Sequence, residues 1–319
     1  MATINQKTVL DLQAKMDIVN PKCVFSAFTY WSWNHYGINL EYEFSQETPS
    51  IFFIANSNVQ YLNYTNDVYN YEMPDQDHNK HQILAPITPN LEIFVNVLSK
   101  QISSIMAHCA KCLGVYVDDI TNEQLEALER KFEIQKIFTV RSNYLYTREQ
   151  LEKMGGKKMQ KKRNHLNFYL KNFADKTVIK ELFEIPFSEI MAYLQNWSSL
   201  YTKFDTEAEL EFVKECEDFI KQKIIKGIGI YLEGKLIGLT ISFQHGDYCE
   251  ILVEHAAKDV HGSYQYLISK NISINHPDVL FIDRQDDMWS DQLDHIKRTY
   301  KPIEVIEKHF LLIKGLKNA

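Results

Sequence analysis

The stretch that decides the fold covers residues 228–256 and reads IGIYLEGKLIGLTISFQHGDYCEILVEHA. Apolar side chains alternate with other side chains along much of it, which is the period of a β-strand. Two dipeptides, Glu233-Gly234 and Gly246-Asp247, interrupt the alternation, and dipeptides of this kind favour tight hairpin turns. The stretch therefore predicts three antiparallel strands that follow one another as a meander.

Helices and strands are predicted on both sides of this meander. The expected ranges are 176–185 (strand), 186–201 and 207–226 (helices) before it, and 262–271 (helix), 279–283 (strand), 290–300 (helix) and 309–314 (strand) after it. This is the element order of an N-acyltransferase domain of the GNAT type. Order alone is a weak argument, because many α+β folds flank a meander with helices.

The first half of the chain mixes strands with helices. Its apolar spacing predicts a helix at 90–113, and Thr121 with Gln124 three residues later fits a capping box that opens a second helix at 122–132. The aromatic cluster around Trp31 and Trp33 is predicted to lie in a core. Strands are expected at 50–55, 59–64, 115–117 and 137–140, and a polar loop at 69–80.

Length and composition predict two domains. The chain has 319 residues, of which 45% are hydrophobic, and a typical domain has about 150 residues. We therefore expect residues 1–150 and 151–319 to form two domains of the α+β class. Each should contain a mixed, mostly antiparallel sheet flanked by helices, and the second should carry the active site.

The cysteines and the hydropathy pattern predict a cytoplasmic protein. No run of 18 apolar residues occurs, and the first 15 residues lack the apolar core of a secretory signal. The five cysteines are odd in number and scattered, which favours reduced thiols over a disulfide framework. We expect no membrane span.

A basic segment stands out against the net charge of -7. The residues from Lys153 to Lys171 include seven lysines and arginines and no acid. If 157–163 is helical, lysines four residues apart form adjacent basic rows, which suit the phosphates of tRNA or of a pantetheine-type pyrophosphate. A solvated face is the ordinary alternative. The residues predicted to bind donor phosphates or tRNA are Lys157, Lys161, Lys162 and Arg163, and Lys158 extends the second row.

Two blocks of sequence resemble the family that shares the C-terminal domain of phosphatidylglycerol lysyltransferase. The first block, residues 144–173, reads YLYTREQLEKMGGKKMQKKRNHLNFYLKNF. The second comprises Glu254, GSYQ at 262–265, DRQDDM at 283–288, Lys297 and YKP at 300–302. The similarity extends more weakly over 20–140. Asn143 stands where the family's pattern would place an acid, just before the first tyrosine of the first block.

The resemblance implies a tandem GNAT-like protein that moves an aminoacyl or acyl group to an amine or hydroxyl. Relatives that carry membrane helices use aminoacyl-tRNA as donor and a lipid headgroup as acceptor. For this chain the resemblance implies aminoacyl-tRNA as the candidate donor, with acyl-CoA disfavoured, and a small-molecule or lipid-headgroup-like acceptor.

Candidate site residues follow the ends of two late strands. Glu254 ends the meander's third strand, where GNAT-type folds commonly place a base, and Tyr300 is the candidate acid. Charged residues after the strand at 279–283 are placed to hold a ligand. The residues predicted to bind substrate are Arg284, Asp286, Asp287, Lys297 and Tyr264. A salt bridge or a solvated loop is the structural alternative for each charged residue.

Two other functions remain open: a CoA-dependent N-acetyltransferase, and a non-catalytic protein that binds an amino acid or peptide on a duplicated GNAT scaffold. CoA users usually carry an R/Q-x-x-G-x-G/A loop. Here Asp259 replaces the Arg or Gln and Tyr264 the second small residue, which disfavours a pyrophosphate. His108 with Cys109 and Cys112 has the spacing of half a zinc site, but no second pair accompanies it, so no metal site is predicted.

Overall fold

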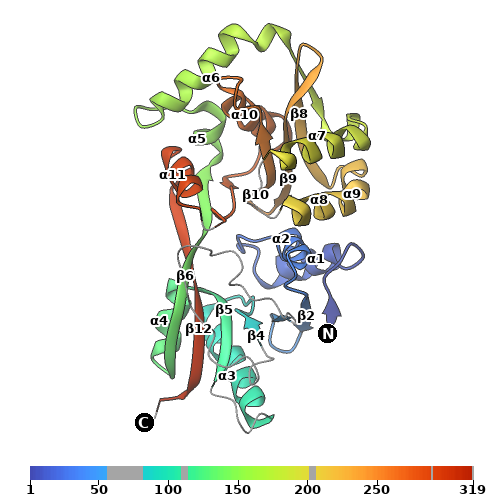
Figure 1. The fold of residues 1–319 in the computed structure, drawn as a ribbon. Coiled ribbons are helices and arrows are strands. Elements are labelled where there is room, and N and C mark those ends of the chain that lie inside the picture. Colours follow the sequence, from blue (N-terminus) through green and yellow to red (C-terminus); the bar gives the residue numbers. More distant parts are fainter. Residues whose placement is uncertain (56–81, 109–113, 201–205, 289, 318–319) are drawn as a thin grey trace. The chain divides into compact units, whose positions relative to one another are not determined.

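The computed structural model of the chain describes residues 1–55, 82–108, 114–200, 206–288 and 290–317 (Figure 1). The chain divides into two compact units. The first comprises Met1–Ser142 together with Ile306–Ala319, and the second comprises Asn143–Val305. The chain thus leaves the first unit, builds the whole of the second and returns to the first.

The second unit is built on the predicted meander. Its three strands are antiparallel neighbours, and Glu233 and Gly234 in the first turn both have positive φ angles, 51° and 85°, as a type I′ hairpin requires. In contrast to these antiparallel pairs, β10 and β11 pair in parallel. The strand order is β6 (Phe132–Thr147), β11 (Phe281–Asp283), β10 (Tyr248–Ala256), β9 (Lys235–His245), β8 (Ile225–Leu232) and β7 (Thr177–Glu181).

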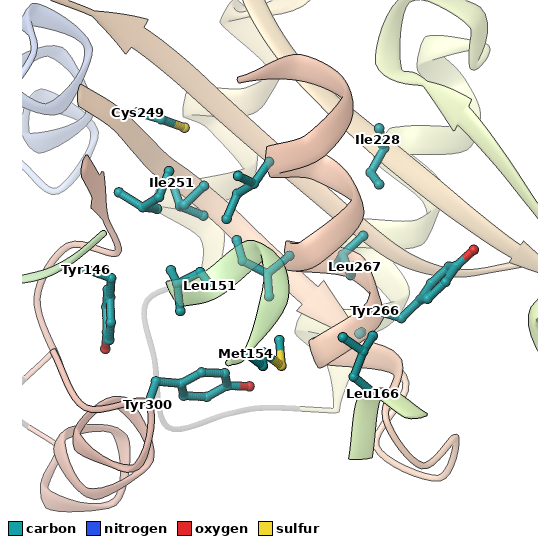
Figure 2. Close-up of a cluster of buried hydrophobic side chains, with 14 of the residues drawn as sticks. Tyr146, Leu151, Met154, Leu166, Ile228, Cys249, Ile251, Tyr266, Leu267 and Tyr300 are labelled. Carbon is teal, nitrogen blue, oxygen red and sulfur yellow. The ribbon is translucent and has the colours of Figure 1, made fainter. Parts of the chain in front are cut away.

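Helices cover the meander because its strands are buried along nearly their whole length. Figure 1 shows α10 on one side of β8–β10 and α7, α8 and α9 on the other. The core beneath α10 gathers side chains from α5, α6, the sheet and Tyr300 (Figure 2). The helices are α5 (Arg148–Lys153), α6 (Gln160–Asn172), α7 (Phe187–Ser199), α8 (Thr206–Glu215), α9 (Glu217–Lys221), α10 (Ser263–Asn275) and α11 (Asp291–Thr299).

The first unit contributes further strands to one 12-stranded sheet and has its own helices and core. The core packs α3 and α4 against β5 and β12, and Leu311 and Ile313 of β12 are both fully buried in it. The strand order is β1 (Ala2–Thr3), β2 (Leu40–Ser45), β3 (Ser50–Ala55), β4 (Gln82–Leu84), β5 (Val115–Thr121) and β12 (Glu304–Leu316), with only β4 and β5 parallel. The helices are α1 (Val9–Val19), α2 (Ala27–His35), α3 (Leu91–His108) and α4 (Asn122–Glu129).

The predicted α+β class, with mostly antiparallel sheets flanked by helices, is confirmed. The capping box of Thr121 and Gln124 forms as predicted, and Trp31 is buried in the core of the first unit. The predicted strand at 59–64, the loop at 69–80 and the Cys109–Cys112 pair lie outside the described residues. Within the described residues, no helix is both long and apolar enough to cross a membrane.

Two predicted helices were wrong in their bounds. The helix expected at 207–226 is instead α8 and α9, which end at Lys221, and Lys223 turns the chain with a positive φ of 60° before β8 begins. The helix expected at 157–163 begins only at Gln160. Lys157 and Lys158 therefore precede α6, and the two predicted basic rows do not form on one helix.

Candidate functional site

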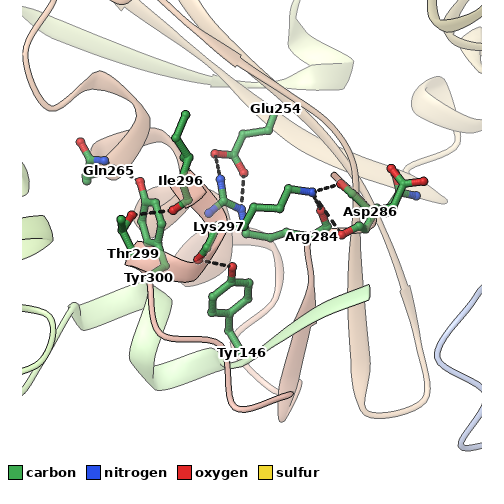
Figure 3. A network of polar contacts seen from close by, with 10 residues as sticks. Tyr146, Glu254, Gln265, Arg284, Asp286, Ile296, Lys297, Thr299 and Tyr300 are labelled. Atoms are coloured by element: carbon green, nitrogen blue, oxygen red, sulfur yellow. Dashed lines mark hydrogen bonds and ion pairs between the residues drawn. The ribbon is translucent and has the colours of Figure 1, made fainter. Parts of the chain in front are cut away.

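A buried ion pair joins β10 to the loop after β11. Arg284 follows β11 directly and Glu254 lies near the end of β10, and the carboxyl ends of these parallel neighbours share one edge of the sheet. Nε and Nη2 of Arg284 donate to the two carboxylate oxygens of Glu254 at 3.1 and 2.7 Å (Figure 3). The two side chains are only 9% and 8% exposed. A two-bond pair of this kind fixes the plane of the guanidinium.

The third guanidinium nitrogen of Arg284, Nη1, is buried and has no hydrogen-bond partner among the described residues. The guanidinium carbon lies 4.7 Å from the centre of the Tyr300 ring and 5.9 Å from that of Tyr146. Burial lowers the pKa of Arg284, but the combined effects of Glu254, Tyr146 and Tyr300 outweigh it, and the pKa is raised overall. The site therefore holds a permanent cation whose Nη1 amino group, with its two hydrogens, is unused.

Tyr300 lies between two cations. Its hydroxyl accepts a hydrogen bond of 2.5 Å from Nε2 of Gln265, and Nζ of Lys162 lies 4.0 Å from the centre of its ring. Burial raises the pKa of the Tyr300 phenol, against the opposing effect of the Arg284 charge. The phenol is therefore neutral at pH 7 and keeps its own proton.

Lys162 reaches this cluster from α6. Burial, together with the charges of Arg284 and Lys161, lowers the pKa of its ammonium group to about 8. Lys161 is exposed, whereas Arg163 donates to the carbonyl oxygens of Met154 and Gly156 at 2.9 and 2.8 Å. Of the predicted phosphate-binding residues, the structure places Lys162 beside Tyr300 and uses Arg163 to hold the turn that leads into α6.

Lys297 supports the loop that carries Arg284. Its ammonium group donates to the backbone oxygens of Arg284 and Gln285 at 2.5 and 3.1 Å and also to that of Asp286 (Figure 3). An ammonium group has three hydrogens, so all three are used by the protein. Burial lowers the pKa of Lys297 to about 8. The hydroxyl of Tyr146 in turn donates to the backbone oxygen of Lys297 at 2.8 Å.

The two aspartates of this loop contact protein groups. Asp287 is buried and accepts a hydrogen bond of 2.8 Å from the hydroxyl of Tyr144, which also lies 2.5 Å from an oxygen of Asp294. The exposed Asp286 accepts from the backbone N–H of Met288 at 3.1 Å. Both contacts shape the loop. Tyr264, by contrast, packs against the apolar core of this unit.

The structure gives a physical reason for the asparagine at position 143. Asn143 is fully buried and donates a hydrogen bond of 2.5 Å to Asp283, the last residue of β11. Burial raises the pKa of the Asp283 carboxyl, and the neighbouring Glu250 raises it further. An acid at position 143 would add a third carboxyl group there and remove the amide donor. The amide of Asn143 therefore supplies a hydrogen-bond donor to the buried carboxyl group of Asp283.

Sequence reasoning missed two residues of the cluster, Tyr146 and Gln265. Both fall inside blocks that carry the family resemblance, which was the available signal. His255, next to Glu254, faces away from the cluster because successive side chains of a strand alternate. It bonds an oxygen of Glu209 at 2.8 Å and stacks on Trp197 with ring centres 3.5 Å apart.

Chemically, the cluster offers donors to an oxygen that carries or develops negative charge. The donors are the Nη1 amino group of Arg284, the Tyr300 phenol and the Lys162 ammonium group. Donors fixed in position before the reaction stabilise the oxyanion of an acyl-transfer step more than mobile water does.

Comparison with known proteins places this cluster inside a matched region. The family model described as phosphatidylglycerol lysyltransferase, C-terminal, matches residues 95–312. An uncharacterised protein of Mycoplasmoides gallisepticum is 30% identical over 306 residues, which are 95% of this chain and 96% of that protein.

Two solved structures are similar in fold. A conserved protein of unknown function from Bacteroides thetaiotaomicron superposes with a TM-score of 0.72 at 16% identity, over 97% of this chain and 98% of that one. The structure named L-PGS from Bacillus licheniformis gives a TM-score of 0.58 at 12% identity, over 100% and 94% of the two chains. At these identities the likeness shows the fold alone.

Proposed function

Because the chain belongs to the family described as the C-terminal region of phosphatidylglycerol lysyltransferase, we propose that it transfers an aminoacyl group from aminoacyl-tRNA to an amine or hydroxyl. The observation that carries the proposal is the buried Arg284, held by Glu254 and left with the Nη1 amino group unused. The aminoacyl-tRNA donor and the small-molecule or lipid-headgroup-like acceptor are parts of this proposal.

The proposed reaction is attack of the acceptor on the ester carbonyl of the donor. A bond forms between the acceptor atom and the carbonyl carbon, the bond to the ribose oxygen breaks, and that oxygen gains a proton. Nη1 of Arg284 binds the carbonyl oxygen as negative charge develops on it. Tyr300 supplies the proton to the ribose oxygen, and the acceptor's proton returns the phenol to its neutral form.

Glu254 is a candidate for two different roles in the proposed reaction. The predicted role is that of a base for the acceptor's proton. In the structure both of its oxygens accept from Arg284, which supports a second role, that of orienting the guanidinium. Lys297 takes no direct part in the proposed step, because its hydrogens hold the loop.

The test is a transfer assay with the purified protein. Bulk tRNA charged with radiolabelled amino acids is incubated with amine and hydroxyl acceptors, including aminated and hydroxylated lipid headgroups, and label outside tRNA is counted. Arg284→Ala should lower transfer at least ~100-fold, as expected for loss of one oxyanion donor. Arg148→Ala is the matched control, because Arg148 also pairs with a glutamate, but with Glu152 four residues along α5 and not with Glu254.

Equal activity of the Arg284→Ala and wild-type proteins would contradict the proposed site. Acetyl-CoA and free amino acids serve as parallel arms. Label transferred from acetyl-CoA would favour the N-acetyltransferase, and thermal stabilisation by free amino acids without any transfer would favour the non-catalytic binding protein.

A further inference from the structure

Aromatic rings gather on the exposed side of α6, outside the cluster around Arg284. Phe168 is 45% exposed. The His261 ring lies 4.7 Å from the Phe168 ring, nearly perpendicular to it at 85°, and 4.4 Å from the ring of His165. Phe168 and His261 are exposed and His165 is half-buried, so this group of rings is a candidate binding surface.

The backbone fixes these rings in place. Gly262, directly after His261, has a φ of 87°, and a Cβ atom there would lie 2.2 Å from the backbone oxygen of His165. Only glycine permits this approach of the α10 start to α6. His261 is thereby held against α6, and the ring group is preorganised.

Cations continue the same helix face towards the proposed active site. Lys161, His165 and Phe168 are four and three residues apart, which places them along one face of α6. The rise from Lys161 to Phe168 is roughly 10 Å. Lys162, beside Lys161, lies over the Tyr300 ring. A path therefore runs from Tyr300, across two lysines, to the rings.

The charge and the protonation state of this path suit a nucleic acid strand. The segment from Lys153 to Lys171 contains no acid. Burial lowers the pKa of His165, and the charges of His261, Lys162 and Lys161 lower it further, so its ring is uncharged at pH 7. Aromatic rings beside lysines are the combination by which proteins hold single strands, with stacked bases and paired phosphates.

We propose that Phe168, His165 and His261 form a stacking platform for the unpaired bases next to the 3′ end of the donor RNA, with Lys161 on their phosphates. This inference rests on the proposed function, in which the donor is aminoacyl-tRNA. The 3′-terminal ester would lie at Arg284 and Tyr300, and the strand would leave the site along α6.

The experiment measures binding of uncharged tRNA and of a short single-stranded RNA by fluorescence anisotropy at several salt concentrations. Phe168→Ala and His261→Ala should each weaken binding of both RNAs about tenfold or more, the loss typical of one stacked base. Phe168→Tyr should retain wild-type affinity. Phe183→Ala is the matched control, because Phe183 is a 38% exposed ring of the same unit away from α6.

Salt dependence separates stacking from charge. Lys161→Ala should lower the slope of log K against log salt by about 1, whereas Phe168→Ala should leave the slope unchanged. The exposed Lys235 on β9 serves as the control for Lys161. If Phe168→Ala lowers the slope as Lys161→Ala does, the rings do not stack bases.

The outcomes distinguish the platform from the proposed function. If wild-type protein transfers aminoacyl groups but Phe168→Ala and His261→Ala bind tRNA normally, the platform is wrong and the function stands. If the short RNA binds through the rings but no aminoacyl transfer occurs, the platform stands and the function is wrong. Absence of binding to either RNA overturns the platform.

Discussion

At the scale of single residues, the pair of Glu254 and Arg284 is a stability element as well as a site. Two charges at 8% and 9% exposure are costly to bury separately. We predict that Glu254→Gln lowers the free energy of unfolding by about 3 kcal/mol, because it leaves the guanidinium buried beside a neutral amide. Urea denaturation measures this loss.

A double-mutant cycle completes that test. Arg284→Met combined with Glu254→Gln should be less destabilising than the sum of the two single substitutions, because no buried charge then lacks its partner. Additive losses would mean that the pair contributes little and that Glu254 is free to act as the predicted base.

Lys162 makes the site sensitive to pH. Its ammonium pKa of about 8 lies below the ordinary lysine value because of burial and the charges of Arg284 and Lys161. The side chain is therefore charged at pH 7 and neutral at pH 9. We predict that binding of uncharged tRNA weakens about fivefold between these two pH values, as loss of roughly 1 kcal/mol of charge interaction implies.

The control for this prediction is Lys162→Arg, measured in the same anisotropy assay. A guanidinium stays charged over the whole range, so the decrease between pH 7 and pH 9 should disappear. A decrease of the same size in the arginine variant would show that another group titrates.

At the scale of elements, the meander was predictable because its information is local. Alternating apolar residues and two turn dipeptides lie within one continuous stretch, and β8, β9 and β10 form there. The start of α6 was not predictable from spacing. Met154 and Gly156 have positive φ angles of 49° and 77°, and Arg163 donates to their carbonyls. The turn that they begin continues through 157–159, which basic periodicity alone assigns to the helix.

In the candidate site, too, some features could be predicted from local sequence and others could not. The positions of Glu254 and Arg284 after two strands could be predicted, but their mutual pairing depends on the parallel register of β10 and β11. Lys297 and Tyr300 are three residues apart, a spacing that puts two side chains on one face of a helix. In the structure the ammonium group of Lys297 donates to backbone oxygens of the loop after β11, whereas the hydroxyl of Tyr300 accepts from Gln265 on α10. The ends of the two side chains therefore meet different elements. Such partners follow from tertiary packing alone.

At the scale of the whole molecule, the two units differ in how the chain builds them. Asn143–Val305 is continuous, whereas the first unit needs Ile306–Ala319 as well. Leu311 and Ile313 fill the core of the first unit, and loss of one such side chain costs about 2–5 kcal/mol against a typical total stability of about 5–15 kcal/mol.

We predict that deletion of residues 306–319 unfolds the first unit and leaves the second folded. Hydrogen exchange followed by mass spectrometry should show lost protection in α3 and β5 and retained protection in β8–β10. A variant that exchanges Leu316, a 60% exposed residue of β12, for Ala is the control. Simultaneous loss of protection in both units would show that they unfold as one.

The return of β12 also sets an order of events during synthesis on the ribosome. All residues of Asn143–Val305 leave the exit tunnel before Ile306–Ala319, so the later-begun unit is complete while the earlier-begun one still lacks its sixth strand. Until that strand arrives, one edge of β5 has no partner from β12. Nascent chains in which residue 305 has left the exit tunnel and Ile306–Ala319 has not are therefore the species that most need a chaperone's protection.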